Sequence, residues 1–368
     1  MIPLFEQYPL LKEKIPYTQL GTFPTPVRHL KNLGKKMGID YLYLKDDGLS
    51  STMYGGNKVR KLEFLLGDAL HKGAKEVLTF GFAGSNHALA TAVYTRKLGL
   101  KSISILLAQP NAWYVRRNLL FSHVCGAELH HFRNEIAAYI PTIIILLQKK
   151  VRLGKFPYII GPGGSSPLGA IGYVNAGFEL REQVSMGLIP EPDTIFIPLG
   201  TMGTALGLSI GLKAAGLKTR VVPVRVTDEK YANKKKFFKL FEKTMALALS
   251  LDASFPRVEI SADEMDIQHD FFGEQYACFT EQGMAAIDLL ERSEGIRLEG
   301  TYTGKAMAAL IDHLRRNGAR NEVILFWNTH NTRNFSDVIN EIDYHQLHRR
   351  FHRYFEEDVQ PLDKHPSE

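Results

Sequence analysis

The chain has 368 residues, of which 45% are hydrophobic and 23% are charged, and this composition excludes a disordered or fibrous protein. A formal net charge of +6 can indicate a nucleic-acid partner, but the charges are scattered and no aromatic-interleaved basic motif accompanies them. The one sharp basic cluster, around Lys234–Lys236, is typical of a solvated helix face. We therefore expect no nucleic-acid partner.

Cysteine use and hydropathy indicate a cytoplasmic protein without a membrane partner. Cys125 and Cys278 lie in no metal-like spacing, which argues against both a disulfide framework and a zinc site. The N-terminus lacks the basic and apolar regions of a signal peptide, and the most apolar run, residues 137–147, is too short to span a bilayer.

Short β-rich segments alternate with longer amphipathic ones, which predicts an α/β fold with a largely parallel sheet. The predicted strands cover residues 41–45, 76–80, 102–107, 128–132, 157–160, 194–198, 220–226 and 323–327. The predicted helices cover residues 58–71, 87–98, 137–151, 168–186, 205–215, 281–293 and 304–317. Near the C-terminus, the spacing of His345, His348 and His352 predicts a solvated helix rather than a metal site, because no inward-facing carboxylate completes one.

The first Gly-rich segment, Gly55-Gly56-Asn57-Lys58, precedes a predicted helix. The glycines allow a tight turn, and Lys58 then projects from the first helical turn, where the helix dipole disfavours a cation. A lysine in such a place can form an imine with a carbonyl cofactor, and its pKa falls when it is buried. The alternative is a surface lysine beside a loop.

The second segment, residues 80–87, joins a strand to a helix through Gly81 and Gly84. The free backbone N–H groups of a helix start can bind an anion. Ser85 and Asn86 add short polar side chains that could contact a cofactor hydroxyl or a substrate carboxylate, although plain capping of the helix explains them equally well.

The third segment, Gly200-Thr201-Met202-Gly203-Thr204, also lies between a strand and a helix, and its composition is typical of a phosphate-binding turn. It matches neither the dinucleotide fingerprint nor the nucleoside-triphosphate loop, which disfavours a dehydrogenase. One phosphate-binding turn and one imine-forming lysine are what pyridoxal phosphate requires.

Taken in order, Gly55 to Glu63, Ser85-Asn86-His87 and Gly200 to Thr204 resemble the D-cysteine desulfhydrase and 1-aminocyclopropane-1-carboxylate deaminase family. These are pyridoxal-phosphate enzymes of fold type II, the tryptophan-synthase-β-like fold. The likeness runs from Thr22 to about Trp327. It implies a homodimer whose subunit has two open, twisted α/β domains with the cofactor in the cleft. Residues 1–65 and 165–345 would form the large cofactor-binding domain, residues 66–164 the small α/β domain, and residues 346–368 a charged tail.

The resemblance also implies roles for the matching residues. Lys58 would bind pyridoxal 5'-phosphate as a Schiff base and shuttle protons. Asn86 would contact the cofactor's phenolic oxygen and the Gly200–Thr204 backbone its phosphate, while Thr303 would sit at the pyridine nitrogen. The residues that would face the substrate are Ser85, Asn86, His87, Tyr276 and Tyr302, with Ser85 and both tyrosines also catalytic. For each tyrosine the alternative is a buried structural side chain.

Two positions favour the desulfhydrase-like branch of the family. Thr303 and His87 stand where the deaminase branch has glutamate and glutamine, and a neutral threonine stabilises the protonated pyridine nitrogen far less than a carboxylate does. We therefore predict α,β-elimination from a small amino acid, with D-cysteine as the first candidate, giving a 2-keto acid and ammonia.

The sequence also departs from the family pattern. Residues 329–333 replace a Thr-Gly-Gly-Thr-Pro run, and Gly300-Thr301 replaces an Asp-Pro-Val-like run. The polar bulk of His330 and Arg333 predicts a substrate larger or more acidic than cysteine. The alternatives are ring opening of 1-aminocyclopropane-1-carboxylate, racemisation or β-replacement on another amino acid, and a cofactor-binding protein without turnover.

Overall fold

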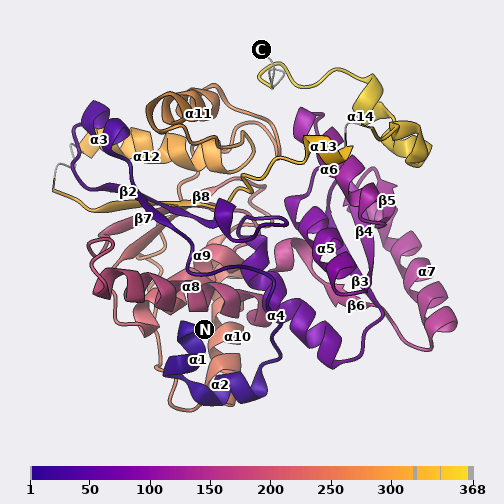
Figure 1. Ribbon diagram of the computed structural model, residues 1–368, viewed down its shortest axis with the longest axis horizontal. Helices are drawn as coiled ribbons and strands as arrows, with labels where there is room; N and C mark the ends of the chain where they lie inside the picture. Colours follow the sequence, from indigo (N-terminus) through magenta and orange to yellow (C-terminus); the bar gives the residue numbers. More distant parts are fainter. Residues whose placement is uncertain (1, 318–320, 340, 364–368) are drawn as a thin grey trace. The chain divides into compact units, whose positions relative to one another are not determined.

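The computed structural model describes residues 2–317, 321–339 and 341–363, and the chain divides into two compact units (Figure 1). Unit 1 comprises Met1–Phe64 and Ser165–Arg333, and unit 2 comprises Leu65–Gly164 and Asn334–Glu368. Each unit has its own sheet, so the predicted α/β class is confirmed. Residues 334–345 group with unit 2, whereas the sequence-based division assigns them to the large domain; the functional domain division stays a prediction.

The sheet of unit 1 has the strand order β1-β2-β9-β7-β8. Its strands are β1 (Val27–His29), β2 (Leu42–Asp46), β9 (Ile324–Asn328), β7 (Thr194–Leu199) and β8 (Arg220–Arg225). β1 runs antiparallel to β2, whereas the pairs β2–β9, β9–β7 and β7–β8 are parallel. Every residue of β7 is buried, which explains its continuous apolar sequence, because a parallel sheet is covered on both faces.

Helices cover both faces of this sheet (Figure 1). On one side of the sheet lie α3 (Lys31–Met37), α11 (Glu281–Glu294) and α12 (Thr303–Asn317). On the other side lie α8 (Pro167–Ser185) and α9 (Gly203–Ala214), and beyond them α1 (Pro3–Gln7), α2 (Pro9–Lys14) and α10 (Lys234–Leu251) pack against helices. Glycines let α8 and α9 approach closely, since a Cβ atom on Gly211 would lie 2.2 Å from the Val174 carbonyl oxygen. The lysines that begin α10 are exposed, so the predicted solvated helix face is confirmed.

Unit 2 contains a parallel sheet of order β5-β4-β3-β6. Its strands are β5 (Glu128–Phe132), β4 (Lys101–Leu107), β3 (Glu76–Phe82) and β6 (Tyr158–Ile160), and its longer helices are α5 (Asn86–Lys97), α6 (Trp113–Val124) and α7 (Glu135–Leu153). Helix α4 (Lys58–His71) begins in unit 1 and ends in unit 2. Within the described residues, no helix combines the length and the hydropathy needed to cross a membrane.

The prediction of one helix carrying His345, His348 and His352 was wrong. This segment forms the short helices η3 (Tyr344–Gln346), η4 (Arg349–Phe351) and α14 (Arg353–Glu356), after the equally short α13 (Ser336–Ile339). Tertiary contacts explain the difference, because buried Tyr354 contacts the backbone amide of Gln109 and the ring of His131 within unit 2.

A buried ionic network joins the elements of unit 1. The guanidinium of Arg60, on α4, donates to both carboxylate oxygens of Asp47 and both of Glu179, with its shortest contact at 2.8 Å to each. The amine of Lys45, on β2, also pairs with Glu179. Trp327 Nε1 donates to Asp47 at 2.9 Å. Burial acts to raise the pKa of Glu179, but the two cations outweigh it and hold the pKa at about 2.

Replacing Glu179 by glutamine should destabilise unit 1 strongly, because Lys45 and Arg60 would keep buried charges with too little compensation. We expect a loss of about 3–5 kcal/mol in the free energy of unfolding, measured by urea denaturation. The control is Glu264→Gln, which removes an exposed ion pair with Lys213 and should change stability by about 1 kcal/mol or less. Equal effects of the two substitutions would contradict a structural role for the network.

Candidate functional site

A tight turn fixes the start of α4, where Lys58 is the first helical residue. Gly56 has a φ of 89°, and a Cβ atom there would lie 2.9 Å from the Thr329 carbonyl oxygen. A Cβ atom on Gly55 would lie 2.0 Å from the Gly48 carbonyl oxygen. Only glycine fits both positions, so the turn holds the backbone next to Lys58 in one conformation.

The Lys58 amine has the electrostatics of a nucleophile. The side chain is half-buried, and burial lowers its pKa to about 8, while the carboxylate of Glu299 acts in the opposite direction. A substantial fraction of the amine is therefore neutral near physiological pH, and the neutral form is the one that attacks a carbonyl group.

The predicted phosphate-binding turn connects β7 to α9. Met202 has a φ of 71°, a left-handed conformation that is unfavourable for a residue with a side chain and is typical of functional sites. The hydroxyl groups of Ser165 and Thr201 lie 2.8 Å apart, and the Gly203 amide donates to Ser165 Oγ at 3.1 Å. Backbone amides and hydroxyl groups thus gather at the N-terminus of a 12-residue helix, as anion binding requires.

Two contacts connect this turn to the lysine-bearing helix. Asn57 Nδ2, beside Lys58, donates to Thr204 Oγ1 at 3.0 Å. Lys61 is 1% exposed, and its amine lies 3.5 Å from Ser165 Oγ. Burial and then the charge of Lys58 lower the pKa of Lys61. Two lysines on one buried helix face repel each other, which suits a site that receives an anion.

Sequence analysis missed Lys61, although its spacing from Lys58 was a usable signal. Residues three apart share a helix face, so a functional Lys58 implied that Lys61 faces the same surroundings.

The predicted tyrosines and Thr303 lie together at the start of α12. A hydrogen bond joins the hydroxyl groups of Tyr276 and Tyr302, and burial followed by the influence of Tyr302 raises the pKa of Tyr276. Ala277 has a left-handed φ of 67°, the second such strained residue beside a predicted site residue. A Cβ atom on Gly200 would lie 3.9 Å from Tyr302 Cε1, so the phosphate-binding turn borders this tyrosine.

Glu299 organises the same helix start and was also missed by sequence analysis. Its carboxylate accepts the backbone amides of Thr301, Tyr302 and Thr303 at 2.7–2.8 Å and the Thr303 hydroxyl at 3.2 Å. Burial raises the pKa of Glu299, and the amide hydrogen bonds oppose this effect. A glutamate just before a helix start was the available signal, because anions are stabilising there.

Unit 2 holds the remaining predicted residues at the start of α5. Ser85 is the N-cap, with its hydroxyl accepting the Ala88 amide at 3.2 Å, so the capping alternative is confirmed for it. Asn86 Oδ1 accepts from Asn118 Nδ2 at 2.9 Å. Ser85 and Asn86 are half-buried, whereas His87 is buried. The structure thus gathers Ser85, Asn86 and His87 in unit 2, and the other predicted residues in unit 1.

The atypical segment 329–333 supports the turn before Lys58. Asn331 Oδ1 accepts the Gly55 amide at 2.7 Å, and the Thr329 carbonyl oxygen accepts the Asn57 amide at 3.1 Å. Arg333 Nε donates to the Ser51 carbonyl oxygen at 3.2 Å. The residues that depart from the family pattern therefore contact the backbone turn that positions Lys58.

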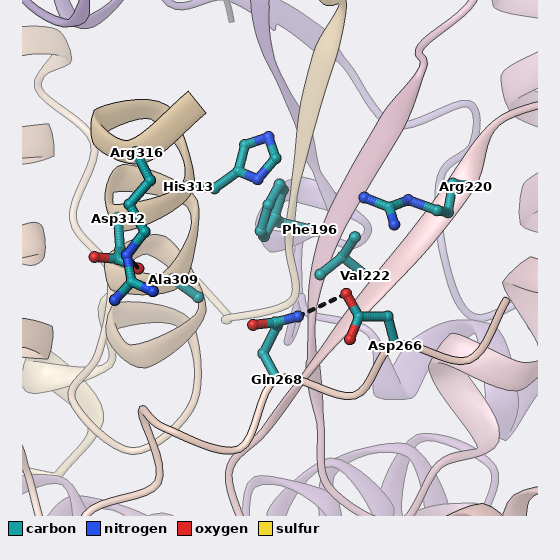
Figure 2. Close-up of a pocket in the computed structure, with 9 residues that line it drawn as sticks. All are labelled: Phe196, Arg220, Val222, Asp266, Gln268, Ala309, Asp312, His313 and Arg316. Atoms are coloured by element: carbon teal, nitrogen blue, oxygen red, sulfur yellow. Dashed lines mark hydrogen bonds and ion pairs between the residues drawn. The ribbon is translucent and has the colours of Figure 1, made fainter. Parts of the chain in front are cut away.

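A separate polar pocket of about 310 Å³ in unit 1 is not the candidate site (Figure 2). Its lining residues are Phe196, Arg220, Val222, Asp266, Gln268, Ala309, Asp312, His313 and Arg316. They include none of the predicted site residues. Arg220 begins β8, and Arg316 lies at the end of α12, so the pocket lies toward the amino ends of the strands, whereas ligands of parallel sheets bind at the carboxyl ends.

Comparison with known proteins finds relatives that match most of the chain. The sequence model of the family described as "Pyridoxal-phosphate dependent enzyme" matches residues 18–329. A Pyrococcus horikoshii protein, provisionally named 1-aminocyclopropane-1-carboxylate deaminase, is 35% identical over 87% of this chain and 93% of its own. The D-cysteine desulfhydrase of Serratia proteamaculans is 32% identical over 86% of this chain and 94% of its own. The crystal structure of an "ACC deaminase homologue" aligns with a TM-score of 0.75 and 31% identity, over 90% of this chain and 95% of that one.

The lowered pKa of Lys58 predicts its reactivity. In the cofactor-free protein, labelling of Lys58 by an amine-selective acylating reagent should show a midpoint near pH 8, because only the neutral amine reacts. Glu299→Gln should lower this midpoint further, since the carboxylate raises the pKa of Lys58. Mass spectrometry of the Lys58 peptide measures both values.

The control for this experiment is Glu291→Gln, which changes an exposed glutamate on α11 and should leave the midpoint where it is. An equal midpoint in the wild type and in Glu299→Gln would show that the carboxylate does not act on the amine.

Proposed function

The chain belongs to the pyridoxal-phosphate-dependent enzyme family, and from this premise we propose that it is a lyase that eliminates the β-substituent of a small amino acid, with D-cysteine as the first candidate. It has the fold type II architecture and uses pyridoxal 5'-phosphate. The observation that carries the proposal is the half-buried Lys58 amine, whose pKa is about 8. The adjacent residue, Asn57, donates its side-chain amide to Thr204 in the predicted phosphate-binding turn.

The residues of unit 1 fit the chemistry of the cofactor. The bound cofactor supplies an electron sink that stabilises negative charge at the substrate α-carbon. Lys58 holds the cofactor and moves the proton at that carbon. Lys61 and the Gly200–Thr204 turn bind the phosphate by charge and by hydrogen bonds. The Thr303 hydroxyl, which donates to Glu299 in this structure, would be the partner of the pyridine nitrogen.

The remaining residues orient the substrate in this proposal. The N-terminus of α5, with Ser85 at its cap, suits a carboxylate, because backbone amides and the helix dipole favour an anion there. Asn86 would contact the phenolic oxygen of the cofactor, as the family resemblance implies. The hydroxyl groups of Tyr276 and Tyr302, which are hydrogen-bonded to each other, would face the reacting carbon and its leaving group. His87, whose ring is buried, would also face the substrate, as the family resemblance implies.

Thr303 favours elimination over the ring opening named for some relatives. A neutral hydroxyl gives a weaker electron sink than the glutamate of the deaminase branch, and a good β-leaving group needs less stabilisation of the α-carbanion. Ring opening remains the alternative, because similar relatives carry the deaminase name.

We further propose a cytoplasmic homodimer in which unit 1 contributes the cofactor-binding domain. The family resemblance supports the homodimer. Cys125 and Cys278 are free and half-buried, as is common in a reducing compartment.

The first test is a visible absorbance spectrum of the purified protein, followed by addition of D-cysteine. A cofactor band should be present in the wild type and absent in Lys58→Ala, and pyruvate and sulfide should appear only with the wild type. The matched control, Lys72→Ala, removes an exposed lysine just beyond α4 and should keep both properties.

Three outcomes of this test decide the reaction class. Formation of 2-oxobutyrate from 1-aminocyclopropane-1-carboxylate, without products from D-cysteine, would favour the deaminase alternative. A cofactor band without any product from a broad set of amino acids would indicate a binding protein without turnover. The absence of a band after addition of pyridoxal phosphate would overturn the proposal.

Lys61→Met tests the assignment of the phosphate site. Loss of a charge-assisted hydrogen bond should weaken pyridoxal phosphate binding by about 10–100-fold. Binding of pyridoxal, which lacks the phosphate, should change little. Equal losses for the two compounds in absorbance titrations would show that Lys61 acts on the fold rather than on the phosphate.

A further inference from the structure

The polar pocket of unit 1 lies between helix α12 and the sheet, and we call it the α12 pocket (Figure 2). Four residues of the helix line it, at positions i, i+3, i+4 and i+7 of one helix face: Ala309, Asp312, His313 and Arg316. A helix face that is turned toward a sheet is normally apolar. The three polar residues in the last turns of this face therefore call for a separate explanation.

The sheet side of the α12 pocket has an apolar base and one cation. Phe196 of β7 and Val222 of β8 are buried and form the base. Arg220 lies two residues before Val222, so both side chains project from the same face of β8. The Arg220 side chain is exposed, and its guanidinium points into the space between strand and helix (Figure 2).

The third side of the pocket comes from a segment that is hydrogen-bonded to the edge of β8. The Gln268 amide donates to the Pro223 carbonyl oxygen, and the Arg225 amide donates to the Gln268 carbonyl oxygen, both at 2.9 Å. Gln268 Nε2 donates to the Asp266 carboxylate at 2.9 Å (Figure 2). These hydrogen bonds hold the exposed Asp266 carboxylate at the pocket.

The charged groups of the α12 pocket are not all paired with one another. Arg316 Nε lies 2.9 Å from the Asp312 carboxylate, so these two charges balance. Within the part of the chain that the structure describes, the Arg220 guanidinium has no hydrogen-bond or ion-pair partner, and Asp266 has an amide partner but no cation. One cation and one anion in the same pocket thus lack an opposite charge.

A zwitterion supplies both missing charges in one small molecule. The carboxylate of a free amino acid matches the fork of a guanidinium, and its ammonium group matches the Asp266 carboxylate. The base formed by Phe196, Val222 and Ala309 suits an aliphatic side chain. A nucleotide or another polyanion would be repelled by the carboxylates of Asp266 and Asp312. The volume of about 310 Å³ is also at the small end of ligand sites.

We propose that the α12 pocket is a second small-molecule site, which binds a free aliphatic amino acid with its carboxylate on Arg220 and its ammonium group on Asp266. The pocket shares no lining residue with the site around Lys58. A ligand there would contact β7 and α12, the elements that also lead to the Gly200–Thr204 turn and begin at Thr303. Binding requires neither the cofactor nor the proposed reaction.

The test is a ligand-observed NMR titration of the cofactor-loaded protein with both enantiomers of leucine and of valine. Two analogues of leucine are titrated beside them: 4-methylpentanoate, which lacks the amino group, and 3-methylbutylamine, which lacks the carboxylate. Leucine of at least one hand should bind about 10-fold more tightly than either analogue, because each analogue leaves one charge of the pocket unpaired.

Two substitutions assign the charges of the ligand to their partners. Arg220→Gln and Asp266→Asn should each weaken leucine binding by about 10-fold. Arg220→Gln should also remove the preference for leucine over 3-methylbutylamine, whereas Asp266→Asn should remove the preference over 4-methylpentanoate. The matched controls, Arg257→Gln and Asp288→Asn, change exposed residues of unit 1 outside the pocket and should bind leucine as the wild type does.

The cofactor band separates this proposal from the proposed function. Arg220→Gln and Asp266→Asn should keep the band and any turnover of D-cysteine, because neither residue belongs to the candidate site. Circular dichroism confirms folding of every variant. A protein without a cofactor band would contradict the proposed function, and the NMR titration would still test the α12 pocket.

Three results would overturn the proposal. The first is a wild type that binds neither enantiomer of leucine or of valine, as expected if Arg220 and Asp266 simply pair with each other in solution. The second is binding of 4-methylpentanoate or inorganic phosphate as tight as that of leucine, which would indicate a plain anion site. The third is equal leucine affinity in the wild type and in Arg220→Gln, which would assign the binding to the cofactor site.

Discussion

The buried pairing of Arg60 with Asp47 and Glu179 is the constraint on which the rest of unit 1 depends. Together with Lys45 it balances two cations against two anions, and each charge alone would be strongly unfavourable away from water. The four residues come from β2, η1 (Asp47–Leu49), α4 and α8, so the network fixes these elements relative to one another. Because Arg60 lies two residues after Lys58, the same ion pairs fix the helix start from which Lys58 projects.

The same low dielectric separates structural cations from reactive ones. Burial lowers the pKa of Lys45 and of Lys58, but the side chain of Lys45 has a direct carboxylate partner and an amide partner as well. Lys58 is influenced by Glu299 from a distance, and its pKa falls to about 8. A carboxylate in direct contact therefore opposes the effect of burial on the pKa of Lys45, whereas at Lys58 only the charge of Glu299 acts in that direction. Burial and then the charge of Lys58 lower the pKa of Lys61 as well.

In unit 2, the fold decides which apolar residues of helix α7 are buried. The run at residues 137–147 is too short for a membrane span, and the helix it forms contributes only part of its surface to the core. Ala138 and Ile145 pack against the sheet, while Ile140 and Ile144 face solvent within a single chain. Hydropathy averaged along the sequence does not separate these two faces, because they alternate within each turn.

The sequence by itself determined most of the strands and longer helices, the Gly-rich turns, and the place of Lys58 at a helix start, although it missed β1 and α6. These features depend on periods of two and 3.6 residues and on glycine conformations, which are local. Only the tertiary structure decided that Lys45 meets Glu179, which lies 134 residues away, and that Asn331 supports the turn at Gly55. It also brought Glu299 to Lys58, and it replaced the expected C-terminal helix with short helices anchored by Tyr354. Such contacts join residues that are distant in the chain and become favourable only when folding buries them together. No local pattern of residues predicts them.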